Sequence, residues 1–266
     1  MDALELPRDD GQDGCRRLIR ARVYNFDGPA QACRKLTLFL VSGLDNDLNP
    51  RRIERYLVLA LESGAEPVLV LNKADLCQDL GAAIGAARSV AAGHPVVVAN
   101  ALDGTGVEAM REWLRPGVTA SLLGSSGVGK STLLNTLLGV ERQPTAGVRE
   151  HDSRGRHTTT HRELFPIPGG GLLLDQPGLR EIQPWAEAAS VEAAFPEVAE
   201  HAVNCRFRDC RHQGEPGCAV VGAVDEARLA SYDKLSRERD ALAIKRRDRQ
   251  GSLWVRQFQK LHDKRR

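Results

Sequence analysis

The sequence predicts an α/β fold, in which a mostly parallel sheet is covered by helices on both faces and is followed by a small helical domain. Short apolar runs alternate with segments of helical periodicity through residues 36–184, as in sheets whose strands are joined by helices. A glycine-rich segment, residues 124–131, stands between a predicted strand and a predicted helix. Beyond the last predicted strand, three cysteines and a histidine crowd into residues 205–218, which indicates a separate domain built around a metal.

Local signals define each element of this fold. A helix begins at Pro50 after the capping residue Asn49 and stops at Gly64. Further helices are predicted over residues 107–114 and 130–138. The predicted strands cover residues 36–41, 67–71, 95–99 and 118–123, and a hairpin covers residues 164–167 and 171–174. The predicted domains are an N-terminal remnant or linker, a sheet domain and a helical domain, at residues 1–35, 36–184 and 185–266.

Length and composition limit the class of protein. A chain of 266 residues can bury a substantial core. No stretch approaches 18 apolar residues, and residues 1–13 lack the basic-then-apolar pattern of a signal peptide. We therefore expect a cytoplasmic protein that does not associate with a membrane. We also expect a monomer, although these observations do not bear on the oligomeric state.

The C-terminal segment is strongly basic. Residues 234–266 contain 12 Lys or Arg and 4 Asp or Glu, a net charge of +8, so the other residues sum to −6 within the total of +2. A basic tail on an acidic body indicates a polyanionic partner, although a solvated helical face would have the same composition. Trp254 and Phe258 lie four positions apart in this segment, which favours a docked helix over a loose tail.

The glycine-rich segment matches the phosphate-loop pattern G-x-x-x-x-G-K-[ST] at every fixed position. Its glycines let the backbone curl so that successive amides face phosphate groups at the positive end of the following helix. Lys130 would reach the β- and γ-phosphates, and Ser131 would bind Mg²⁺. The predicted nucleotide-contacting residues are Gly124, Ser125, Ser126, Gly127, Val128, Gly129, Lys130, Ser131 and Thr132. This motif does not select the base.

A second motif, Asn72-Lys73-Ala74-Asp75, follows the apolar strand at residues 67–71 and indicates guanine. The Asp75 carboxylate can accept two hydrogen bonds from the N1 and N2 edge of guanine, which adenine does not offer. Asn72 can tie neighbouring loops together, and the stem of Lys73 can lie along the purine. Asn100 and Ala101 follow the next strand, where GTPases carry a loop whose backbone contacts guanine. Ordinary GTPases have the phosphate loop first, so the reversed order predicts a circularly permuted GTPase.

Motifs further downstream complete a candidate hydrolytic site. Asp175-Gln176-Pro177-Gly178 fits the D-x-x-G element, in which Asp175 holds Mg²⁺ through water and the Gly178 amide senses the γ-phosphate. Leu179 stands where many GTPases have the glutamine that orients the attacking water, so another residue or a partner must supply that group. The polar stretch before this motif contains His157, our candidate for placing the water, although a lone loop histidine is often only solvated. One threonine of that stretch would complete the Mg²⁺ shell, and we take Thr159 as this ligand.

The cysteine and histidine cluster has the composition of a closed zinc site. Three thiolates and one imidazole within 14 residues make a Cys3His set, which suits a tetrahedral structural zinc: Cys205, Cys210, His212 and Cys218. The connecting loops are poor in apolar residues, so they have little to hold their shape without a metal. With no open coordination position, the zinc would pin the C-terminal helices and would not be catalytic.

The combined motifs resemble the bacterial small-ribosomal-subunit-dependent, circularly permuted GTPases. The resemblance covers about residues 36–266 and includes Gly155-Arg156-His157-Thr158-Thr159-Thr160 beside the motifs above, while Gln176 replaces the usual small hydroxyl residue. It implies binding of GTP and GDP, Mg²⁺ with GTP, and one structural zinc per chain. It also implies the small (30S) ribosomal subunit and its rRNA as partners, hydrolysis stimulated by that subunit, and a role late in its maturation.

The same resemblance implies an OB-fold barrel before the GTPase domain. About 35 residues precede the first predicted strand, too few for a five-stranded barrel, so we expect the barrel to be absent or truncated.

Two other functions stay open. One is an RNA-binding scaffold that holds nucleotide with little turnover, and the other is a P-loop ATPase or small-molecule kinase, against which the Asn72 motif argues.

Overall fold

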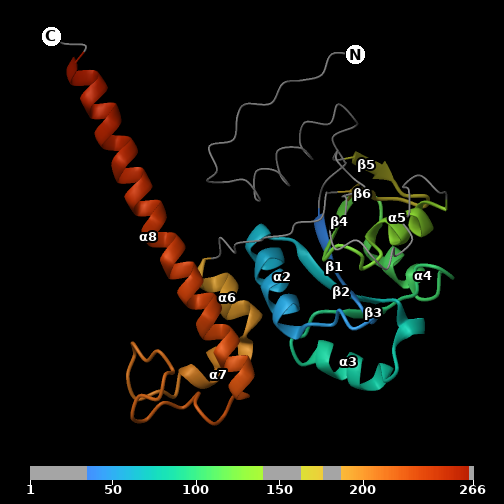
Figure 1. Ribbon diagram of the computed structural model, residues 1–266, viewed down its shortest axis with the longest axis horizontal. Coiled ribbons are helices and arrows are strands. Elements are labelled where there is room, and N and C mark those ends of the chain that lie inside the picture. Colours follow the sequence, from blue (N-terminus) through green and yellow to red (C-terminus); the bar gives the residue numbers. More distant parts are fainter. Residues whose placement is uncertain (1–34, 140–162, 176–186, 264–266) are drawn as a thin grey trace, which may run out of the picture. The chain divides into compact units, whose positions relative to one another are not determined.

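The computed structural model describes residues 35–139, 163–175 and 187–263 (Figure 1). The chain divides into two compact units, residues 1–182 and 183–266. The first unit contains the sheet and the second contains helices and a loop region rich in cysteine, and each is described on its own.

The first unit is built on a six-stranded sheet with the order β3-β2-β1-β4-β6-β5. All neighbouring strands are parallel except β5 and β6, which form an antiparallel hairpin. The predicted α/β class with a mostly parallel sheet is therefore confirmed. The strands are β1 Lys35–Gly43, β2 Glu66–Asn72, β3 Val96–Val98, β4 Val118–Gly124, β5 Glu163–Pro166 and β6 Leu172–Asp175.

Helices join these strands, and Figure 1 shows α2 and α5 on opposite sides of the sheet. The side chain of Asn49 accepts hydrogen bonds from two amides of the first turn of α2, and Gly64 ends that helix in the left-handed region, as the sequence predicts. The helix predicted over residues 107–114 is instead a single α-turn, α4, followed by the 3-10 turn Arg111–Trp113. The helices of this unit are α2 Pro50–Ser63, α3 Leu80–Arg88, α4 Val107–Met110 and α5 Lys130–Leu138.

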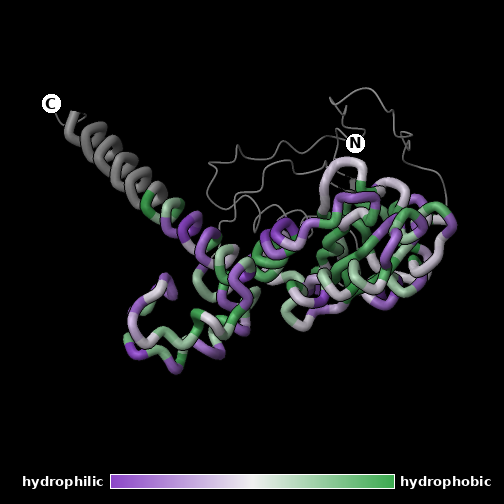
Figure 2. Tube along the Cα trace, turned by 60° about the horizontal axis from the view of Figure 1, so that its bottom comes forward, coloured by the Kyte–Doolittle hydropathy of each residue, from purple (hydrophilic) through white to green (hydrophobic). Residues whose placement is uncertain are grey.

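The core lies on both faces of the sheet because consecutive residues of the central strands are buried. In β1, Phe39 and Val41 join one buried cluster with residues of α4 and α5, and the alternate residues Leu38 and Leu40 are also buried. Figure 2 shows the same pattern, with hydrophobic strands inside the first unit. Burial on both faces is typical of parallel sheets covered by helices.

The strand order reverses beside β1, and this places the nucleotide motifs. The chain passes from β1 to β2 and β3 on one side, then returns to β4 on the other side of β1. The register pairs Gly43 with Asn72 and Val41 with Gly124, so the guanine and phosphate motifs emerge at the same edge of the sheet. In open α/β sheets, ligands bind outside the carboxyl ends of the strands at such a reversal.

The second unit contains α6 Ala188–Ala194, α7 Pro196–Ala202 and the 38-residue α8 Glu226–Asp263. The nearly buried Arg228 of α8 joins these helices. Its guanidinium forms an ion pair with Glu197 at 2.5 Å, donates to the Ala194 carbonyl at 2.7 Å, and lies 4.1 Å from the centre of the Phe195 ring. The helix expected near the C-terminus thus begins before the basic segment, and the side chains of Trp254 and Phe258 lie outside the described residues. Among the described helices, none has the length and apolar character needed to cross a bilayer.

Candidate functional site

The phosphate loop connects β4 directly to α5. Gly127 and Gly129 have φ angles of 83° and 94°, in the left-handed region that glycine adopts without strain. The N-cap residue of α5 is Gly129, which has no side chain to accept from the amides of the first turn, so these amides face the loop. The Lys130 ammonium group donates to the carbonyls of Gly124 at 2.9 Å and Ser125 at 2.6 Å, so this side chain folds back over the loop. A curled loop, helix amides without a side-chain cap and a lysine over the loop are suited to binding an anion.

Asn72 joins three loops at the carboxyl edge of the sheet. Its side chain is 1% exposed; Nδ2 donates to the Val128 carbonyl at 2.8 Å, and Oδ1 accepts from the Ala101 amide at 3.0 Å. A Cβ atom at Gly129 would collide with the Asn72 amide group, so glycine is needed there for close approach as well as for its φ angle. Asn72 therefore lies between the phosphate loop and the loop after β3, the tying contact expected from the sequence.

The remaining residues of the guanine motif form a short turn after β2. Lys73 has a φ of 62°, and its ammonium group forms an ion pair with Asp45. Asp75 lies in the 3-10 turn Ala74–Leu76 and is exposed, with its carboxylate open to solvent. The Ala74 amide donates to the Ala99 carbonyl at 3.2 Å, which fixes this turn against the end of β3. An exposed carboxylate on a braced turn is suited to accepting hydrogen bonds from a ligand.

The loop after β3 is ordered by its own polar side chains. Asn100 accepts from the Leu102 amide at 3.1 Å and donates to Asp103 at 2.9 Å. Hydrogen bonds from Thr105, its backbone amide first, lower the pKa of Asp103 below its ordinary value. The Ala101 carbonyl accepts from the Thr136 hydroxyl of α5 at 2.8 Å. This loop is therefore tied to both the guanine motif and the helix that follows the phosphate loop.

The segment between β1 and α2 also contacts both nucleotide motifs. Arg52 donates to Asp47 at 2.6 Å and to the Ser125 hydroxyl of the phosphate loop at 2.5 Å, and Asp45 pairs with Lys73. Asp45, Asp47 and Arg52 are absent from the sequence-predicted site because they belong to no nucleotide motif. The position of Asp45 and Asp47 directly after a buried strand was the available signal, since the carboxyl ends of parallel strands meet at one edge.

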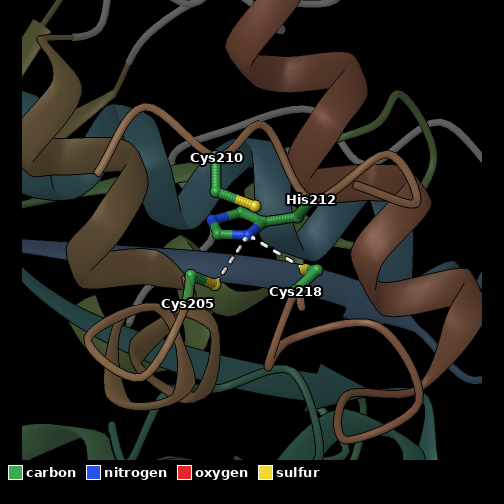
Figure 3. Close-up of side chains that lie close together, drawn as sticks. All are labelled: Cys205, Cys210, His212 and Cys218. Carbon is green, nitrogen blue, oxygen red and sulfur yellow. Dashed lines mark hydrogen bonds between the residues drawn. The ribbon is translucent and has the colours of Figure 1, made fainter. Parts of the chain in front are cut away.

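In the second unit, four ligand atoms converge in the loops between α7 and α8 (Figure 3). All lie within 4.8 Å of one another, and each residue is half-buried. His212 Nδ1 lies 3.6 Å from one sulfur and 3.5 Å from another. Zinc bonds of about 2.3 Å to sulfur and about 2.0 Å to nitrogen, at a tetrahedral angle, put the two ligand atoms about 3.5 Å apart. The geometry therefore fits a tetrahedral zinc held by Cys205, Cys210, His212 and Cys218.

Glu215 organises the loop that carries two of these ligands. Its carboxylate accepts from the amides of Arg211 at 2.9 Å and Gln213 at 2.8 Å, and Cys210 Sγ lies 3.6 Å away. Hydrogen bonds from its own amide and from those of Arg211 and Gln213 lower its pKa to about 2. The flanking residue His212 has a φ of 60°, so the loop holds a backbone conformation that L-residues seldom adopt. No nearby motif pointed to Glu215.

The profile of the RsgA GTPase family matches residues 29–185, which are 157 of the 266 residues. The chain belongs to the RsgA GTPase family.

Curated relatives carry the same family name. A small ribosomal subunit biogenesis GTPase RsgA from Opitutus terrae is 53% identical over 218 residues, covering 80% of this chain and 59% of that protein. A protein of the same name from Methanosarcina acetivorans is 46% identical over 231 residues, covering 84% of this chain and 63% of that protein. This chain therefore spans about six-tenths of the length of these relatives.

Two solved structures share the fold of this chain. The crystal structure of YjeQ from Thermotoga maritima superimposes with a TM-score of 0.56 at 30% identity, covering 77% of this chain and 72% of that one. YloQ, described as a circularly permuted GTPase, gives a TM-score of 0.53 at 22% identity, covering 79% and 70%, and supports the fold alone. The permuted order predicted from the sequence is confirmed, with the guanine motif after β2 and the phosphate loop after β4.

The structure places some residues of this RsgA-family site and not others. The guanine motif, Asn100, Ala101 and the phosphate loop through Thr132 share one edge of the sheet, while the three cysteines and His212 form their own cluster in the other unit. Asp175 is the last residue of β6, and only its backbone is described. His157, Thr159 and Gly178 lie outside the described residues.

Proposed function

We propose that this chain binds and hydrolyses GTP and acts late in maturation of the small (30S) ribosomal subunit, with hydrolysis stimulated by that subunit. The observation that carries the proposal is the position of Asn72. Its buried side chain joins the guanine motif to the phosphate loop across a sheet with permuted motif order, in a chain of the RsgA GTPase family. The relatives named small ribosomal subunit biogenesis GTPase support the choice of partner.

Nucleotide binding divides between the two ends of the site. Asp75 accepts hydrogen bonds from guanine, the Lys73 stem lies along the purine, and the loop at Asn100 and Ala101 offers backbone groups to the base. The amides from Gly124 to Thr132 surround the phosphates of GTP or GDP, and Lys130 exchanges its carbonyl contacts for the β- and γ-phosphates. Adenine offers the wrong edge to Asp75, so GTP is preferred to ATP.

Hydrolysis requires residues around the γ-phosphate. Ser131 and Thr159 are the proposed Mg²⁺ ligands, with Asp175 acting through water; the ion, when bound, neutralises charge on the phosphates. The Gly178 amide contacts the γ-phosphate. His157 orients the attacking water and accepts its proton, because Leu179 has no polar group to do so. Both His157 and Thr159 belong to a polar stretch that the small subunit orders, which explains stimulation by that partner.

We propose three domains, which separate nucleotide hydrolysis from zinc and rRNA binding. Residues 1–35 form an N-terminal remnant or linker, residues 36–184 the GTPase domain, and residues 185–266 a zinc-binding helical domain. One structural zinc per chain, bound by the Cys3His cluster, holds the loops before α8. The basic residues of α8 contact rRNA through its phosphates, and the protein acts as a cytoplasmic monomer.

The test compares GTP turnover of the purified chain alone and with small ribosomal subunits. We expect slow turnover alone, strong stimulation by small subunits, and weaker stimulation by large subunits, which serve as the control. Co-sedimentation with small subunits should require a non-hydrolysable GTP analogue. Tight GTP binding with subunit association but no stimulated turnover would instead identify a scaffold. Equal affinity for ATP and GTP would contradict the guanine assignment.

A further inference from the structure

The segment from Leu44 to Asn49, between β1 and α2, lies between the two nucleotide motifs. It leaves the sheet from the strand that pairs with β2 on one side and with β4 on the other. The Leu44 amide donates to the Asn72 carbonyl at 2.8 Å, so the segment begins against the guanine motif. We call this segment the bridging segment.

Arg52 connects the bridging segment to the phosphate loop. Its backbone amide donates to the carbonyl of Asn49 at 3.0 Å and lies 3.2 Å from the Asn49 side-chain oxygen. The helix cap therefore fixes the backbone position of Arg52, from which its side chain extends. From there, Nη1 donates to Asp47 Oδ1 at 2.6 Å and to Ser125 Oγ at 2.5 Å. The side chains of Arg52 and Asp47 are 34% and 29% exposed, so the group is partly desolvated.

An ion pair anchors the other end of the bridging segment. Asp45 pairs with Lys73, whose side chain is only 19% exposed. Asp45 Oδ1 and Asp47 Oδ2 are buried and accept no hydrogen bond from the described residues. The contacts described for the two carboxylates therefore run through Lys73 and Arg52, and loss of either cation would leave a partly buried negative charge poorly compensated.

The phosphate loop is thus held at two points. Asn72 bonds the Val128 carbonyl near the end of the loop, and Arg52 bonds the Ser125 side chain near its beginning. The first contact belongs to a known nucleotide motif, and the second does not. A loop held at both ends keeps its amides directed at the phosphates before a nucleotide arrives, which lowers the ordering cost of binding.

We propose that Arg52 is a positioning residue for the phosphate loop: braced by Asp47, it fixes Ser125 and so preorganises the loop for nucleotide phosphates. This role rests on the proposed GTP-binding function. Arg52→Ala should weaken GDP binding about tenfold, since a hydrogen bond from a charged group is worth about that factor when partly exposed. Ser125→Ala should give a loss of similar size. Both substitutions remove the same hydrogen bond, the one between Arg52 and Ser125. The double variant should therefore bind GDP about as tightly as whichever single variant has the lower affinity.

The experiment uses the full chain with two measurements. Titration with a fluorescent GDP gives the affinity of the wild type, Arg52→Ala, Ser125→Ala and the double variant. Arg52→Lys, which keeps a cationic donor, should recover part of the loss. Arg88→Ala is the matched control, because Arg88 is an exposed arginine in the last turn of α3. Amide hydrogen exchange of the nucleotide-free proteins reports the loop itself, and Arg52→Ala should raise exchange at residues 124–128 but not along β4 or α5.

The outcomes separate this proposal from the proposed function. Weaker GDP binding with faster exchange confined to the loop supports a positioning role. Additive losses in the double variant, or unchanged loop exchange, would overturn it while leaving GTP binding intact. Faster exchange across the whole first unit would also overturn it, since Arg52 would then serve only stability. If the wild type binds no guanine nucleotide, the proposed function fails, and the exchange measurement alone still decides whether Arg52 holds the loop.

Discussion

Removing the Asn72 side chain should open the site at its centre. In Asn72→Ala, the Ala101 amide and the Val128 carbonyl each lose a partner at 3.0 Å and 2.8 Å, and both residues are at most 4% exposed. A buried polar group left without a partner costs about 1–3 kcal/mol, so the two together should lower the free energy of unfolding by about 3 kcal/mol. The loops that Asn72 ties together should separate, and GDP affinity should fall about 100-fold or more.

Urea unfolding followed by circular dichroism measures the stability, and amide exchange at Ala101 measures the local opening. Ser121→Ala is the matched control: Ser121 is equally buried, in β4, but makes one hydrogen bond, to the Leu174 carbonyl at 3.1 Å. It should cost about 1 kcal/mol and leave exchange at Ala101 unchanged. If Asn72→Ala unfolds within about 0.5 kcal/mol of the wild type and Ala101 stays protected, the two hydrogen bonds do not hold the loops and the reasoning fails.

Three further variants test the rest of the site. Asp75→Asn should remove about 3 kcal/mol of the preference for GTP over ATP, because the N1 and N2 donors of guanine lose their carboxylate acceptor. Competition binding with ATP measures this preference, and an unchanged value would exclude Asp75 from base recognition. Cys210→Ala should abolish stoichiometric zinc and make the helical unit sensitive to protease while residues 36–184 still bind GTP, and a protease-resistant C-terminus without zinc would argue against a structural metal. His157→Ala should keep GTP affinity but lose about 10²–10⁴-fold of the turnover stimulated by small subunits, and full retention would assign the catalytic group to the ribosome or to a neighbouring threonine.

Elements whose ends are marked by capping residues, proline, glycine or a known motif could be predicted from the sequence. Asn49-Pro50 and Gly64 define α2, and the phosphate-loop pattern defines the start of α5. By contrast, α3 has no counterpart among the predicted helices. It is mostly Ala and Gly, and its only buried residues, Ala83 and Ala87, leave no stripe of large apolar side chains to reveal its period.

The same distinction holds for the candidate site. The Cys3His set and the nucleotide motifs are defined by local spacing, so a single sequence is enough to suggest them. The Arg52–Ser125 contact spans 73 positions, and it depends on the register between β1 and β4. Glu215 could not be predicted for the same reason. It organises its loop by accepting hydrogen bonds from the amides of Arg211 and Gln213, and these amides point toward it only in the folded loop. Contacts that exist only after strands align or a loop closes leave no local pattern.

Both edges of the described sheet are short strands, and this affects how readily the protein aggregates at high concentration. β3 has three residues, and β5 has four and ends at Pro166, which cannot donate a ladder hydrogen bond. Long, flat edge strands offer unpaired backbone groups to another chain and seed aggregation. Here the long strands β1, β2 and β4 are enclosed within the sheet. The backbone hydrogen-bonding groups of these long apolar strands are thus kept from pairing with another protein molecule.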